Sequence, residues 1–332
     1  MRLSILDQSP ISEGSTGSQA LHNTINLARL ADSLGYHRYW VAEHHGGPML
    51  ACASPEALIG PLAAATTNLR VGSGGVMLPH YSPLKVAETF SMLSGLFPGR
   101  IDLGVGRAAG TDATTTFALQ RDRRHAAPDD FPAQLTELLA YLWDQMPADH
   151  PFARLTTLPG RPEVPDPWLL GSSPQSGLWA AELGLPYAFA DFINPSGAAI
   201  ARRYREQFTP SGKIAAPYVI AAISVLCADT NEEAQRLAAS SKMLLTLLFQ
   251  GRLIPVPPVE KALAFLAERS VDTLPLGRRA IIGSQSTVQR GIQEVVAEYE
   301  ADEVMILTIT YEHTARRRSY ELVADALGLG AE

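Results

Sequence analysis

The sequence predicts a (β/α)₈ TIM barrel with an insertion before its last strand–helix units. Short apolar runs alternate along the chain with segments whose apolar residues recur at helical spacing. Eight strand candidates can be counted, and a helical segment follows each of them. The length of 332 residues, 46% of them hydrophobic, suits one large core. We therefore expect a single domain over residues 1–332.

The first half of the chain shows this alternation with clear boundaries. Gly35 suits the end of the first helix, and Ser54 and Pro55 suit the start of the second as N-cap and first-turn proline. Pro98 and Gly99 form the turn before the fourth strand. The predicted strands are 3–6, 39–42, 69–72 and 101–105, and the predicted helices are 19–34, 55–65, 83–96 and 132–146.

The second half repeats the pattern after a proline-rich stretch at 158–167. Residues 250–282 interrupt the order, because they contain several prolines and show no sustained helical period. Their position suggests an insertion over the rim; a mobile lid and a plain surface excursion both remain open. The predicted strands are 168–171, 187–190, 218–227 and 304–309, and the predicted helices are 176–183, 198–208, 232–248, 287–299 and 315–327.

Composition excludes several classes of protein. A formal net charge of -7 gives no basic field that would attract nucleic acid or anionic lipid. The two cysteines, Cys52 and Cys227, are far apart and lack CxxC spacing, which suits a reducing compartment. Residues 1–7 carry one positive charge and are cut short by Asp7, so they resemble neither a signal peptide nor a membrane span. We expect a cytoplasmic protein that binds neither nucleic acid nor membranes.

Four polar or glycine-rich segments each follow a predicted strand and precede a helix. They are 43–45, 72–75, 104–107 and 171–173. Parallel strands bring their carboxyl ends to one rim, where folds of this type build their active sites. We therefore expect these segments to form one pocket.

The segment at 104–107 combines missing side chains with a positive charge. Gly104 and Gly106 would let a ligand approach the backbone, and Arg107 could clamp an anion in a bidentate manner. The alternative is that Arg107 pairs with a carboxylate such as Asp102 or Asp112.

Serines cluster at the start of the helix after the fifth strand. Ser172, Ser173 and Ser176 lie where free backbone N–H groups favour a phosphate and hydroxyls can add donors. Together with Arg107 they would make a cup for one phosphate group. The alternative is that they are ordinary N-caps. No Walker A or GxGxxG motif supports a different nucleotide site.

The remaining two segments, 72–75 and 43–45, suggest a surface for a flat ligand and a candidate histidine site. Glycines within 72–75 suggest a bulge against which a ring could lie, although a plain bend would explain them too. Glu43, His44 and His45 contain metal-ligand types, but neighbouring strand residues point to opposite faces. We therefore expect no metal site.

These motifs together resemble the bacterial luciferase-like flavin monooxygenase family. The resemblance covers most of the chain and is specific for the family but not for a substrate. It is carried by 42–45, 69–79, 83–88 and 97–107. Residues 6–10, 37–40 and 106–112 are most similar to the single-chain branch that includes monooxygenases of aromatic polyketide biosynthesis.

The resemblance implies a cofactor and a reaction. Family members use reduced FMN and O₂, and the flavin forms a C4a-hydroperoxide that oxygenates a small organic substrate. This chain shows no reductase domain, so a separate flavin reductase would supply the reduced FMN. The resemblance also implies a homodimer formed through the early helices. Two alternatives stay open: hydride transfer with the deazaflavin F420, and a non-catalytic flavin-binding protein.

The resemblance also assigns the flavin-binding residues. The ring would pack on the third strand at Gly74 and Gly75, where the family has a cis peptide bond. Gly106 replaces a cysteine of luciferase and leaves more room near the ring. The phosphate site maps onto Arg107, Ser173 and Ser176, with Ser172 in place of a glutamate.

His44 is the predicted catalytic residue. An unperturbed pKa of about 6.5 would suit proton exchange with the substrate or the flavin at neutral pH. His45 would be its structural neighbour. The competing interpretation is that His44 only packs and forms hydrogen bonds beneath the flavin.

Overall fold

The computed structural model describes residues 1–107, 111–125, 129–160, 163–211, 213–269 and 278–330. Eight parallel strands close into a ring, in which β6 pairs with β7, β7 with β9 and β9 with β1. The predicted TIM barrel is therefore confirmed. The ring strands are β1 (Arg2–Asp7), β2 (Arg38–Val41), β3 (Arg70–Met77), β4 (Ile101–Gly106), β5 (Asp166–Gly171), β6 (Tyr187–Ala190), β7 (Val219–Cys227) and β9 (Glu303–Leu307).

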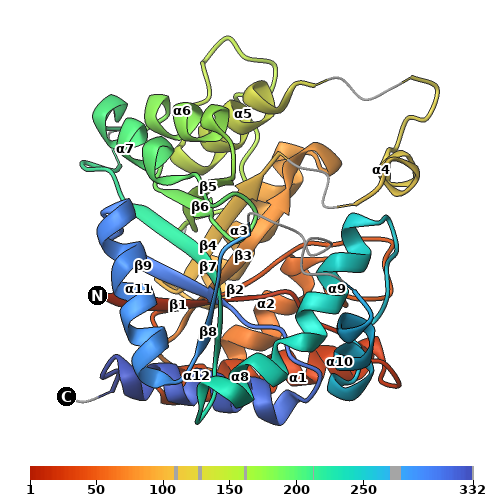
Figure 1. Cartoon of the computed structure of the whole chain (residues 1–332). Helices are drawn as coiled ribbons and strands as arrows, with labels where there is room; N and C mark the ends of the chain where they lie inside the picture. Colours follow the sequence, from red (N-terminus) through yellow and green to blue (C-terminus); the bar gives the residue numbers. More distant parts are fainter. Residues whose placement is uncertain (108–110, 126–128, 161–162, 212, 270–277, 331–332) are drawn as a thin grey trace.

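Helices surround this ring, as Figure 1 shows. Thr16, Ser173 and Thr230 cap helices by accepting a hydrogen bond from a backbone N–H three residues later. Ser54 lies at its predicted N-cap position without such a bond, so Pro55 alone marks that start. The helices are α1 (Gly17–Ser33), α2 (Pro55–Ala64), α3 (Pro83–Leu96), α4 (Ala113–Leu119), α5 (Phe131–Trp143), α6 (Pro174–Glu182), α7 (Ala198–Gln207), α8 (Asn231–Leu237), α9 (Ala239–Phe249), α10 (Val259–Ala267), α11 (Gln285–Tyr299) and α12 (His313–Ala326), with a 3₁₀ turn at Leu78–His80.

The glycine-rich segment 72–75 lies inside a strand and does not follow one. β3 continues to Met77, and its pairing with β4 shifts by one residue between Gly74 and Val76. The sequence prediction ended this strand too early, because glycine has a low strand propensity whereas pairing with neighbours keeps the backbone extended.

Residues 250–282 contain more regular structure than the sequence predicts. α10 packs beside α9, and an additional strand β8 (Ala280–Gly283) pairs with β7 outside the ring (Figure 1). The interpretation that this segment has no sustained helical period is wrong at Val259–Ala267, whose buried face includes Val259 and Ala262. Residues 270–277 of the predicted insertion lie outside the described residues.

The insertion is tied to the loop that follows β1. Backbone N–H groups of Val256 and Glu13 donate to carbonyls of Ile11 and Val256, each at 2.8 Å. Lys261 forms an ion pair with Glu13 at 2.7 Å. These contacts hold α10 at the carboxyl end of β1, so this part of the insertion lies at the predicted rim.

The core has two layers that follow from strand alternation. Residues facing the helices form the larger cluster, for example Ile5, Tyr39 and Leu169. Residues at the alternating positions face the inside of the ring, where Trp40 and Trp168 meet edge to face with ring centroids 5.4 Å apart. No helix in the described part of the chain combines the length and apolar character needed to cross a membrane.

The amino end of the ring is closed by a buried ionic network. Arg38 at the start of β2 contacts Asp102 at 2.9 Å and Glu303 at 3.0 Å, and all three side chains are almost fully buried. Arg70 contacts the other oxygen of Asp102 at 2.6 Å. Burial alone would raise the pKa of Asp102, but Arg38 and Arg70 lower it on balance. This end of the ring is therefore filled with satisfied charges.

Candidate active site

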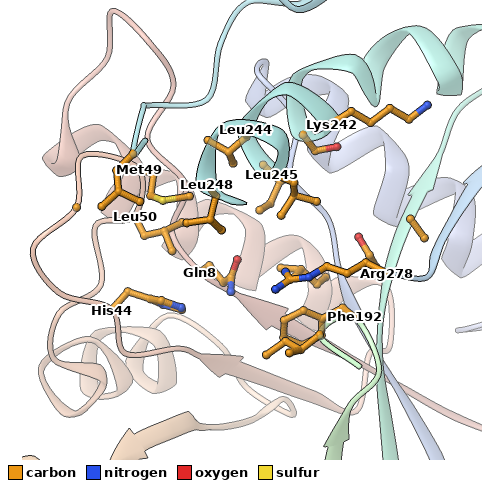
Figure 2. Close-up of a pocket in the computed structure, with 18 of the residues that line it drawn as sticks. Gln8, His44, Met49, Leu50, Phe192, Lys242, Leu244, Leu245, Leu248 and Arg278 are labelled. Atoms are coloured by element: carbon orange, nitrogen blue, oxygen red, sulfur yellow. The ribbon is translucent and has the colours of Figure 1, made fainter. Parts of the chain in front are cut away.

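A cavity of about 690 Å³ opens at the carboxyl end of the ring. Figure 2 shows its mainly apolar wall, to which α9 contributes Leu244, Leu245 and Leu248. Met49 and Leu50 come from the loop after β2. A cavity of this size and character suits a small organic molecule. The labelled polar side chains on its wall are Gln8, His44, Lys242 and Arg278.

The extra strand helps to form this cavity. The carboxyl half of β7 pairs with β8, so that Ser224 lies opposite Ala280 and Leu226 opposite Ile282. All four residues line the cavity. β9 contributes Leu307 from the other side. The cavity therefore lies where β7 leaves the ring to pair with β8.

His44 lines the cavity, as its predicted catalytic role requires. Its backbone N–H donates to the carbonyl of Cys52 at 2.9 Å, which fixes the loop after β2. Burial lowers the pKa of His44 to about 4, although the Ala42 backbone opposes the shift. The predicted unperturbed pKa is therefore wrong, because the side chain is shielded from water. At neutral pH the imidazole is uncharged, and its buried Nδ1 has no hydrogen-bond partner among the described residues.

His45 supports the neighbouring loop. Its Nε2 lies 2.7 Å from the Glu43 carboxylate, which also accepts a hydrogen bond from the Met77 N–H at 2.9 Å. Glu43 is fully buried. The histidine loop is thus joined to the end of β3. Within the described ranges, no group of three or more His, Cys, Asp or Glu side chains could hold a metal ion.

Arg107 is half exposed and weakly held. Its guanidinium forms an ion pair with Asp129 at 2.7 Å, and both side chains are largely in solvent. Neither predicted partner contacts it, because Asp102 belongs to the network at the opposite end of the ring and Asp112 caps α4. An exposed ion pair contributes only about 0–1 kcal/mol. An anionic ligand could therefore replace Asp129 at low cost.

The serines act as caps at the start of α6. Ser173 accepts a hydrogen bond from the Ser176 N–H, and the Ser176 hydroxyl donates to the Ser173 carbonyl at 2.8 Å. The Ser172 carbonyl accepts a hydrogen bond from Asn194 at 2.9 Å. The guanidinium of Arg107 lies 5.8 Å from the ring of Trp179 in the same helix. The structure thus brings Arg107 beside the helix that carries the serines.

The glycines of β3 and β4 allow two backbones to approach closely. The peptide bond between Gly74 and Gly75 is cis, as the resemblance predicts. A Cβ on Gly74 would lie 2.6 Å from Leu6, and one on Gly75 would lie 2.8 Å from the Gly104 carbonyl oxygen. Only glycine fits at Gly75, where the clash is with backbone, whereas at Gly74 the Leu6 side chain would have to move. Gly106 is different, because a Cβ there would meet only Met77, at 3.6 Å.

The four rim segments do not all line the same cavity. Among them, only the histidine segment contributes to the 690 Å³ cavity, through His44 and His45. Gly74, Gly75, Gly106, Arg107 and the three serines lie outside its wall. The expectation of one shared pocket is therefore wrong for this cavity.

Several residues of the cavity were not predicted from the sequence. The leucines of α9 form an apolar run within 243–249, which is unusual for a helix on the outside of a barrel. That run was the available signal. Gln8, Phe192 and Arg278 gave no comparable signal, because only the folded chain brings their loops to the cavity.

Comparisons with known proteins agree with this architecture. Residues 1–320 match the luciferase-like monooxygenase family. A luciferase-like monooxygenase of Escherichia coli (strain K12) is 41% identical over 327 residues, which cover 97% of this chain and 96% of that protein. The N-acetyl-S-alkylcysteine monooxygenase of Bacillus subtilis (strain 168) is 39% identical over 331 residues, 98% of each chain.

Solved structures share the fold over nearly the whole chain. The crystal structure of apo-MsnO8 has a TM-score of 0.88 and 40% sequence identity, and covers 99% of this chain and 98% of that one. The oxygenating constituent of 3,6-diketocamphane monooxygenase from Pseudomonas putida, solved with FMN, has a TM-score of 0.69. At 19% identity, with 98% of this chain and 96% of that one covered, it shows the fold alone. The chain belongs to the luciferase-like monooxygenase family.

Proposed function

We propose that this protein is an FMN-dependent monooxygenase that oxygenates a small organic substrate with O₂. The observation that carries the proposal is the apolar cavity at the carboxyl rim of a barrel whose family match spans residues 1–320. The similar proteins of E. coli and B. subtilis are both named monooxygenases, which supports the reaction class. The reduced flavin would come from a separate flavin reductase.

The residues on the rim fit FMN. Arg107 and the start of α6 offer a guanidinium, paired with the exposed Asp129, beside a capped helix end. The glycines of β3 present bare backbone next to β4, and Gly106 adds room. The phosphate would bind to Arg107 and the serines, and the ring would lie near Gly74 and Gly75. When bound, reduced FMN would supply the electrons that activate O₂.

His44 would move a proton within the cavity. Its low pKa keeps the imidazole uncharged at neutral pH, so the unpartnered Nδ1 can accept a proton or a hydrogen bond from the substrate. The leucines of α9 and Met49 exclude water from the same space. The cavity would therefore hold an apolar substrate against an uncharged base.

Oxygen uptake tests the reaction. The enzyme, FMN, NADH and a flavin reductase would be mixed with candidate substrates in an oxygen electrode, and the products analysed by mass spectrometry with ¹⁸O₂. We expect substrate-dependent incorporation of one oxygen atom. Oxidation of reduced F420 without O₂ would instead support the hydride-transfer alternative, and flavin binding without any turnover would support a binding protein. Sedimentation would test the proposed homodimer.

A further inference from the structure

Arg278 is a cationic side chain on the wall of an apolar cavity. It lies two residues before β8, and Figure 2 shows its side chain extending into the cavity from that side. The guanidinium carbon lies 4.8 Å from the ring centroid of Phe249. Among the described residues, no carboxylate forms an ion pair with Arg278, and no opposite charge contributes to its pKa shift.

The other two cations on the cavity wall are already bound elsewhere. Lys242 donates to the Gln235 side chain at 2.8 Å, and Figure 2 shows its ammonium group directed away from the cavity. Arg279 forms ion pairs with Glu298 at 2.5 Å and with Asp191 at 3.4 Å. Of the three, Arg278 is the one whose charge faces the cavity without a countercharge in the described parts of the chain.

Arg278 is partly buried, and a partly buried cation without a countercharge is unfavourable because it loses part of its hydration. Burial accordingly lowers the pKa of Arg278. The ring of Phe249 offers partial compensation through a cation–π contact. A carboxylate would compensate fully, since its two oxygens match the planar fork of a guanidinium.

The rest of the cavity defines the other end of the ligand. The leucines of α9 and the loop residues Met49 and Leu50 surround a volume of about 690 Å³, which suits an apolar body of moderate size. His44 lies across the cavity from the backbone of Arg278 in Figure 2. A ligand held at one end by Arg278 would extend its apolar part along the leucines toward the histidine.

We propose that the substrate is an apolar carboxylic acid whose carboxylate pairs with Arg278. This inference rests on the proposed function, because it names the substrate class of the same cavity. Arg278 would act in binding and orientation, while His44 would act at the reacting part of the molecule.

Paired ligands that differ only in charge provide the test. Phenylpropionate, phenylbutyrate and phenylhexanoate, and the corresponding amides, would be titrated calorimetrically into the purified full-length protein at neutral pH. We expect at least one acid to bind roughly 10-fold or more tightly than its amide, as for a charge-assisted bidentate contact. Arg278→Gln should remove this preference, and Arg278→Lys should retain part of it. Lys242→Gln is the matched control and should leave the preference unchanged.

Three outcomes would overturn the proposal: equal binding of acid and amide, no binding of any probe at millimolar concentration, or an equal loss of preference in Lys242→Gln. Thermal unfolding of each variant would verify that it is folded. The titration needs neither flavin nor turnover. If the titration shows no acid preference but oxygen is still incorporated, only the proposed carboxylate substrate is refuted. If the acid preference is found but no oxygen is incorporated, only the proposed monooxygenase reaction is refuted.

Discussion

The two ends of the barrel use the same residue types in opposite ways. At the amino end, Arg38 is almost fully buried and contacts two carboxylates. At the carboxyl end, Arg107 has one exposed partner, and Arg278 has no carboxylate partner among the described residues. A satisfied charge holds strands together, whereas an unsatisfied one is available to a ligand. Stability and binding should therefore respond separately to mutations at the two ends.

The largest effect is expected at the amino end. Arg38→Met leaves Glu303 without its arginine and Asp102 with one of its two arginines, Arg70, so the free energy of unfolding should fall by about 3–5 kcal/mol. Urea denaturation would measure this change. Arg124→Met, which removes an exposed pair with Asp122, should leave the denaturation midpoint unchanged. Equal changes in the two variants would show that the buried network does not stabilise the barrel.

The next effect concerns turnover at the carboxyl end. His44→Ala should lose roughly 10²-fold or more in kcat, because it removes a proton acceptor, while it binds reduced FMN almost normally. Steady-state kinetics and flavin titration would separate the two quantities, and added imidazole should restore part of the activity. Weak flavin binding with normal turnover at saturation would instead identify His44 as a binding residue.

Binding of the flavin phosphate should change by a smaller amount. Arg107→Ala should weaken the binding of FMN by about 1.5–3 kcal/mol and the binding of riboflavin much less, since only FMN carries the phosphate. Ser176→Ala should show the same selectivity more weakly. Asp129→Ala is the control, because it frees Arg107 and should not weaken FMN. Equal calorimetric losses for both flavins in Arg107→Ala would contradict the phosphate site.

The effect that is smallest per step is the dependence of stability on pH, taken one pH unit at a time. His44 has a pKa of about 4 in the folded chain and about 6.5 in an unfolded one, so the unfolded state binds more protons between these values. Above about pH 6.5 the protonation of His44 should therefore not affect the free energy of unfolding. Between pH 6.5 and 4 that free energy should fall, by up to about 1.4 kcal/mol for each pH unit. Burial lowers the pKa of His313 in the same direction.

Thermal unfolding between neutral and mildly acidic pH would measure this dependence. His44→Gln should reduce the loss of stability at acidic pH and leave the share of that loss that is due to His313. The exposed His22, replaced by Gln, should not change it. An unchanged profile in His44→Gln would mean that His44 titrates normally, and the base assigned to the cavity would then be partly charged near neutral pH.

The sequence was sufficient for the barrel but not for the whole rim. Alternating apolar runs reveal the ring strands, because each strand has its own local pattern. β8 lies at the end of the proline-containing insertion and pairs outside the ring, so the alternation of strands and helices does not reveal it. The glycines of β3 hid its true length for a related reason: their extended backbone depends on pairing with β4.

The candidate site likewise combines features that the sequence predicts with features that depend on the fold. The position of His44 follows from its place after the second strand, whereas its pKa depends on burial by residues from distant parts of the chain. Arg107 was identified by its neighbours in the sequence. Arg278 and Arg38 were not, because what distinguishes them is the absence or presence of carboxylates that only folding brings near.

The extra strand β8 separates part of the cavity wall from the positions proposed to hold the cofactor. The positions proposed to hold the cofactor lie on or beside β3, β4 and α6, while Ala280 and Ile282 line the cavity from β8, the strand outside the ring. Because β8 pairs with β7 and with no other strand in the described part of the chain, the side chains that it places on the cavity wall can be exchanged without changing the pairing that closes the barrel. Ala280 and Ile282 are consequently suited to a small library for directed evolution, in which new selectivity can be sought while the positions proposed to bind the flavin are left unchanged.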